Sequence, residues 1–216
     1  MKKLLFGILS FSLLFTACAP NADKGSESGD EAIEGSKACV YSYNADSTSM
    51  TWTGYKFNER VGVSGTFTEI ITDGFKESDD IAEVVGNASF KIPVNKVESN
   101  NEDRNKKIAV YFFETINTPV IFGRINGLNY NGENGGNAEV IITMNNQEVM
   151  VSMPYTFENG VLNMSTTIDV NDWNGQMGIN QLNEMCYDLH KGADGVSKLW
   201  PEVKIEVNAV FDRVCE

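Results

Sequence analysis

The sequence predicts an all-β domain: an antiparallel barrel of eight strands that carries one or two short helices. Beyond residue 39, apolar and polar residues alternate over most of the chain, short turn-like segments join the alternating runs, and two stretches have helical spacing. A sheet of this size must protect its edge strands, and closure into a barrel removes them. A sandwich of two sheets would show the same alternation, so the pattern leaves both architectures open.

The alternation is clearest near the C-terminus. Residues 203–211 place apolar side chains at every second position, with Lys204 and Glu206 between them. Asn145-Asn146 and Glu158-Asn159-Gly160 are turn-like links that predict an antiparallel meander. Its strands are expected at 140–144, 149–155 and 162–168, further strands at 50–52, 61–67 and 120–130, and a loop at 131–137.

Two stretches depart from the strand pattern. Residues 101–115 place Ile108, Tyr111 and Phe112 on one helical face. Residues 180–191 repeat apolar side chains at helical spacing, and Gly192 follows as a stop signal. Both helices are short enough to cover an end of the barrel. His190 falls in the last turn of the second, where it is expected only to complement the helix dipole.

The N-terminus predicts export. Lys2 and Lys3 precede an apolar run from Leu4 to Phe15 that is too short to span a membrane as a helix. The segment that ends at Cys18 resembles the bacterial lipobox, in which the cysteine becomes the acylated first residue. We therefore predict a signal peptide over 1–17 and a lipid anchor at Cys18. An ordinary signal peptide is the alternative. The predicted location is a bacterial membrane, with the domain facing the periplasm or the cell surface.

Residues 18–38 are expected to form a flexible tether, because they hold five acidic residues and Ile33 as their one large apolar residue. The whole chain is also acidic, with 17 basic and 30 acidic residues and a net charge of −13. Such a surface repels phosphate backbones, which excludes nucleic acid as a partner. The oligomeric state is left open.

Three further cysteines follow Cys18. Cys39 opens the first predicted strand and Cys215 closes the last, so barrel closure would place them side by side. A disulfide between them would then close the seam in an oxidising compartment, whereas two free buried thiols are the alternative. Cys186 would be a small buried side chain. With one histidine and no CxxC pair, the chain offers no zinc site of the Cys/His type.

Several segments match a known family in order along the first half of the domain. They are 52–56 (WTGYK), 63–67 (VSGTF), 90–94 (FKIPV), 104–113 (RNKKIAVYFF) and 117–122 (NTPVIF). Together they resemble YceI-like domains, and we assign residues 39–216 to such a domain. The resemblance implies an exported, lipocalin-like barrel whose lumen can hold a long isoprenoid lipid.

The predicted binding site is the lumen of this barrel. A polyprenyl chain gains about 0.8 kcal/mol for each buried methylene, so an apolar tube binds it without a cofactor or catalytic groups. The alternative is a filled core, which would make the protein a structural or interaction lipoprotein. The predicted lining residues are Trp52, Val63, Phe67, Val151, Met153, Leu162, Met164, Ile205 and Val207.

Lys56 and Arg104 are candidate contacts for a lipid phosphate, since they lie in the family motifs. A solvated charged face is the alternative, with Glu102 and Asp103 forming local ion pairs. No serine has the sequence context of a catalytic nucleophile, and no spacing singles out a pair of carboxylates. We therefore predict a binding protein and not an enzyme.

Overall fold

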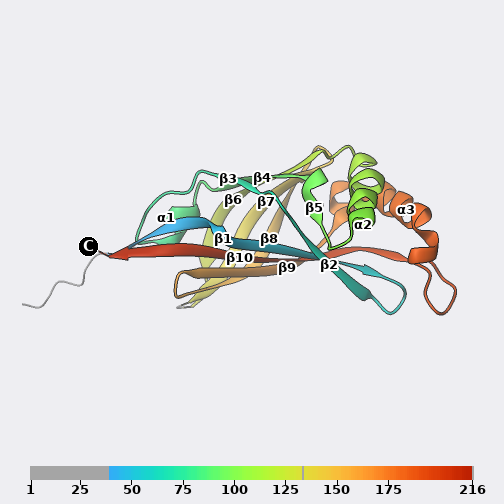
Figure 1. Cartoon of the computed structure of the whole chain (residues 1–216). Coiled ribbons are helices and arrows are strands. Elements are labelled where there is room, and N and C mark those ends of the chain that lie inside the picture. The colour runs from blue at the N-terminus through green and yellow to red at the C-terminus, as the bar shows by residue number, and fades with distance from the viewer. Residues whose placement is uncertain (1–38, 133, 216) are drawn as a thin grey trace, which may run out of the picture. The chain divides into compact units, whose positions relative to one another are not determined.

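The computed structural model describes residues 39–132 and 134–215, which form one strongly curled antiparallel sheet (Figure 1). The predicted signal peptide, Cys18 and the tether lie outside the described residues. The order of the strands is β3-β4-β6-β7-β8-β9-β10-β1-β2-β5, and the all-β prediction is confirmed. The strands are β1 (Cys39–Lys56), β2 (Val61–Phe67), β3 (Ile71–Asp73), β4 (Ser89–Pro93), β5 (Val97–Glu98), β6 (Val120–Tyr130), β7 (Gly135–Met144), β8 (Gln147–Glu158), β9 (Val161–Asp169) and β10 (Leu199–Cys215).

The ten strands correspond to the eight predicted, because two strands of the barrel are each interrupted once and so count as four. β2 continues through residues 68–70 into β3, and β4 continues through the 3-10 turn η1 (Val94–Lys96) into β5. β3 pairs with β4 and β5 pairs with β2, so these two interrupted strands lie along each other. Between the paired segments, the backbone N–H of Thr68 donates to the Lys96 carbonyl at 2.8 Å. The sheet therefore curls back on itself along this seam.

The predicted meander from β7 to β9 is confirmed, and its turns follow from backbone conformation. Asn145 and Asn146 have φ of 47° and 56°, and Asn159 and Gly160 have 52° and 77°. Two-residue hairpin turns of this kind need positive φ, which asparagine and glycine adopt most readily. The predicted loop at 131–137 is too long, because β7 already begins at Gly135. Two glycines open that strand, and residues without side chains give no alternation signal.

The predicted disulfide closes the ends of β1 and β10. Cys39 and Cys215 are paired residues of these adjacent strands and are bonded across a separation of 176 residues. Cys186 is a free thiol and only 5% exposed, as predicted.

Short helices lie at both ends of the curled sheet (Figure 1). At one end, α2 (Glu102–Lys107) continues into the π-helix η2 (Ile108–Glu114) and packs beside α3 (Gln176–Met185), which η4 (Tyr187–Leu189) follows. The 3-10 turn η3 (Val170–Trp173) precedes α3. Within the described residues, no helix is long and apolar enough to cross a membrane.

The helix predictions were correct for 101–115 and wrong in detail for 180–191. The second helix begins earlier, at Gln176, and ends before Cys186, whose φ of −116° is outside the helical range. At the other end of the sheet, α1 (Ile81–Val85) was not predicted, because five residues are too few to show helical spacing.

Candidate functional site

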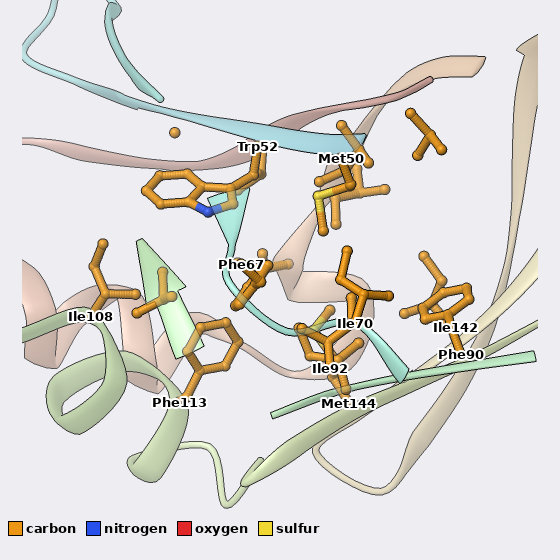
Figure 2. Close-up of a pocket in the computed structure, with 18 of the residues that line it drawn as sticks. Met50, Trp52, Phe67, Ile70, Phe90, Ile92, Ile108, Phe113, Ile142 and Met144 are labelled. Carbon is orange, nitrogen blue, oxygen red and sulfur yellow. The ribbon is translucent and has the colours of Figure 1, made fainter. Parts of the chain in front are cut away.

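A cavity of about 490 Å³ lies inside the curled sheet. In Figure 2, Met50 and Trp52 of β1 point into the same space as Ile92 of β4 and as Ile142 and Met144 of β7. The cavity passes between two groups of buried apolar residues, one at the end with α2 and α3 and one at the end with α1.

Residues in the middle of the strands show that the lumen is not filled. Met50, Ile142, Ile205 and Val207 face inward and line the cavity, yet each is only half-buried. In a close-packed core, such side chains would lose nearly all of their accessible surface. That all four line the cavity and keep accessible surface argues against the alternative of a filled barrel.

Two glycines keep aromatic rings close to the wall of the barrel. Gly65 is the strand partner of Trp52, and a Cβ built on Gly65 would come within 2.3 Å of the Trp52 ring. Gly123 stands in the same relation to Phe90, at 2.0 Å. Each ring therefore lies across the glycine opposite it, and a larger residue there would push the ring toward the lumen.

Of the predicted lumen residues, the structure brings all but one to the cavity. Val151 does not line it; its side chain packs between the two groups of buried residues. Alternation reports which face of a strand is apolar, but not where side chains from opposite walls meet. The residues that line the cavity as predicted are Trp52, Val63, Phe67, Met153, Leu162, Met164, Ile205 and Val207.

Lining residues on the helices were missed, because the lumen was predicted only from strands. Ile108 and Phe113 reach the cavity from η2, and Ile179 and Leu182 from α3. Their helical spacing was visible in the sequence, but it does not say what the apolar face of a helix covers. Only the placement of both helices over one end of the barrel makes them part of the site.

Aromatic side chains close the lumen at the α1 end. Tyr43 of β1 stacks on Phe75, with ring centroids 3.8 Å apart and planes 6° from parallel. Phe211 of β10 packs against both rings. We call these three residues the floor.

The opposite end is open and charged, and we call it the mouth. Of the described side chains that line the cavity, the exposed ones are Asn101, Asp103 and Leu189, at the start of α2 and in η4. The lysine, arginine, aspartate and histidine side chains that line the cavity gather at this same end, and Cys186 lies beside them. They are Lys56, Asp103, Arg104, Lys107 and His190.

The cations at the mouth are held by short contacts. Lys56 Nζ donates to the Leu189 carbonyl at 3.0 Å, and Arg104 Nη1 donates to the Ser99 carbonyl at 3.3 Å. Lys107 forms an ion pair with Asp103 one helical turn away, and this hydrogen bond raises the pKa of Lys107. Lys56 and Arg104, the predicted phosphate contacts, are thus half-buried at the mouth, while Asp103 forms the predicted local ion pair.

The expectation for His190 was wrong. The residue follows η4, lines the cavity and contacts Asn183 of α3, with 3.1 Å between His190 Nδ1 and Asn183 Oδ1. Burial, with a further contribution from the Lys56 ammonium, lowers the pKa of His190 to about 4. An imidazole that is neutral at physiological pH carries no charge with which to complement a helix dipole.

The chemistry of the remaining groups is limited. Burial raises the pKa of the Cys186 thiol, which keeps it protonated and weakly nucleophilic. Within residues 39–132 and 134–215, no three His, Cys, Asp or Glu side chains come together as a metal ion would require. The arrangement can enclose an apolar molecule and contact one polar end of it.

Known proteins resemble this chain in sequence and in fold. Two solved structures have the fold: BcnA from Burkholderia cenocepacia (18% identity, 78% of this chain and 98% of that one, TM-score 0.57), and a polyisoprenoid binding domain from Saccharophagus degradans (13% identity, 82% and 98%, TM-score 0.56). A search of curated proteins finds no match. The model of the YceI-like domain matches residues 41–211, so the chain belongs to the YceI-like domain family.

Proposed function

We propose that the protein binds one long apolar molecule, of isoprenoid type, in its lumen while it is tethered to a membrane. The observation that carries this proposal is the cavity of about 490 Å³, which is apolar along its length and charged at one end. Pockets that hold small ligands have volumes of about 300–1,000 Å³. A chain in the lumen would place its polar end at the mouth, beside Lys56 and Arg104.

The isoprenoid assignment has two supports. The Saccharophagus degradans domain with this fold is described as polyisoprenoid binding. The lining of the cavity also suits a branched chain of irregular outline, because flexible methionine side chains repack around such shapes. Met50, Met144, Met153 and Met164 all line it.

The membrane part of the proposal rests on the sequence. Cys18 carries the proposed acyl anchor, and residues 18–38 the proposed tether. More than one acyl chain is needed to hold a protein stably at a membrane. The proposed tether ends at Cys39, which lies at the same end of β1 as the floor residue Tyr43.

The ligand part is tested by blocking the lumen. Val207 lines the cavity and is half-buried, so Val207→Trp is expected to fill space that the ligand needs. Excluding two or three methylenes would weaken binding by more than tenfold. Displacement of the fluorescent probe N-phenyl-1-naphthylamine by farnesol measures this affinity in the full chain.

Met150→Trp is the matched control, because Met150 is 60% exposed on the outer face of the barrel. It should leave the affinity unchanged. Native mass spectrometry of the unmodified chain should also reveal a co-purifying lipid. Well-folded protein that binds neither probe nor lipid would instead favour a structural or interaction role.

The anchor is tested by Cys18→Ala, which removes the sulfur that acylation needs. The variant should fail to be acylated, and its mass should lack the acyl groups that the unmodified chain carries. The protein from which the signal peptide has been removed should also be lost from the membrane fraction. An acylated Cys18→Ala protein would contradict the assignment.

A further inference from the structure

The mouth holds a hydrogen-bond acceptor whose orientation is fixed. Asn183 Nδ2 donates to the Ser197 carbonyl at 3.4 Å, which leaves Asn183 Oδ1 as an acceptor. This Oδ1 accepts from Ser197 Oγ at 3.2 Å and lies 3.1 Å from His190 Nδ1. His190 Nδ1 must therefore carry the proton, and in the neutral ring Nε2 is an acceptor.

The acceptor His190 Nε2 is unpaired among the described residues. Within the described part of the chain, no group hydrogen-bonds to His190 Nε2, although the ring lines the cavity. The lowered pKa of His190 is consistent with a neutral ring that keeps this lone pair. A ligand in the lumen that donates a hydrogen bond to this acceptor would gain affinity over one that leaves it unpaired.

Lys56 brings a donor to the same end of the cavity as His190. Lys56 Nζ uses one N–H on the carbonyl of Leu189, the residue before His190, and has further N–H groups to offer. The two side chains therefore present one donor and one acceptor together at the end of an apolar lumen. Arg104 and Lys107 add positive charge at the mouth but no acceptor.

We propose that the mouth selects ligands that end in a hydroxyl group, with the oxygen accepting from Lys56 and the proton donated to His190 Nε2. This inference rests on the proposed lumen function and names the end group of its ligand. An ether or ketone would accept from Lys56 but leave His190 unpaired. A phosphate dianion would suit the cations, but it would face the lone pair of His190 without a proton to donate.

The test compares three ligands with the same chain: 1-dodecanol, dodecyl methyl ether and dodecyl phosphate. Each displaces N-phenyl-1-naphthylamine from the delipidated full chain at pH 7. The alcohol should bind about five- to tenfold more tightly than the ether, which is the effect of one buried hydrogen bond. It should also bind more tightly than the phosphate.

Variants separate His190 from the general properties of the lumen. His190→Phe keeps a flat ring but removes the acceptor, so the alcohol and the ether should bind equally. His190→Gln keeps an acceptor and should retain part of the preference, and Tyr187→Phe, at an exposed neighbour, should retain all of it.

Equal affinity of the unmodified chain for alcohol and ether would overturn the inference, while the lumen function would stand because both ligands bind. Tightest binding of dodecyl phosphate would overturn it in favour of an anionic end group on Lys56 and Arg104. Failure of all three ligands and of the probe to bind would overturn the lumen function itself.

Discussion

At the end of the barrel that α1 covers, aromatic rings fill the lumen, and at the end that α2 and η4 cover, charged side chains surround an opening. The floor joins β1, the loop after β3 and β10 through Tyr43, Phe75 and Phe211. The disulfide lies at the same ends of β1 and β10. At the mouth, Leu189 is 55% exposed although it lines the cavity.

The difference shows how one barrel serves stability and binding. Burial of large rings stabilises a fold but leaves no access to its interior. Access requires exposed, weakly packed elements, which belong to the less stable parts of a protein. In this barrel, stable packing is provided at the floor and access to the interior at the mouth, at opposite ends of the strands. Substitutions at the two ends should therefore have different effects.

The largest expected effect on stability is that of the disulfide. Replacing Cys39 and Cys215 with serine would open a loop whose ends are separated by 176 residues. The chain-entropy description gives a loss of about 5 kcal/mol in the free energy of unfolding for such a loop. Urea denaturation followed by tryptophan fluorescence measures it. Probe affinity below the transition should not change, because the bond lies at the floor end.

Cys186→Ser is the control, since it removes a thiol that belongs to no bridge. If it destabilises the protein as much as the double substitution does, the stabilisation comes from buried cysteine side chains in general. The floor would then lose its special role.

Single side chains at the two ends provide a second comparison. Phe75→Ala removes the ring that stacks on Tyr43 and contacts Phe211, and should cost about 3 kcal/mol. Leu189→Ala at the mouth should cost less than about 0.5 kcal/mol, because that side chain is largely exposed. Urea denaturation of both variants gives the two losses in the free energy of unfolding. Equal losses would show that the two ends are packed alike.

The strands could be predicted from the sequence because each has one apolar face. Residues 203–211 and the meander were recognisable from alternation and from Asn145-Asn146 alone, and the cysteine pairing followed once the barrel was assumed. The seam was different. Between Phe67 and Ile71 the pairing changes register, and a short interruption of this kind leaves no periodic signal.

The site was predictable in its apolar part but not at its mouth. Strand periodicity predicts which residues face inward, so Trp52 and Met164 were found, whereas whether opposite walls touch depends on the curvature of the sheet. The role of His190 depends on contacts with Asn183 and Lys56, which are far away or irregularly spaced in the sequence. Helical spacing alone therefore predicted only a place in the last turn of a helix, where a histidine complements the helix dipole.

The smallest expected effect tests how far water is excluded from His190 at the mouth. The pKa of His190 is lowered from its ordinary value of 6.5 to about 4. As the pH falls from 6.5 toward 4, the unfolded chain binds a proton that the folded protein does not. Stability therefore decreases over this range and, for this group, reaches a plateau below pH 4. Because the ring is partly open to solvent, the loss should be about 1–2 kcal/mol and not the full value of the shift.

His190→Gln isolates this contribution, because glutamine does not titrate. Carboxylates with lowered pKa, such as Glu98 and Asp194, also lose stabilising charge in acid, but they are present in both proteins and their effect cancels in the difference. Urea denaturation at pH 7 and pH 4.5 should show that the unmodified chain loses about 1–2 kcal/mol more than the variant. An equal loss in both proteins would mean that His190 is well hydrated. The mouth would then hold water where we place the end of a ligand, and the contrast with the floor would be one of packing alone.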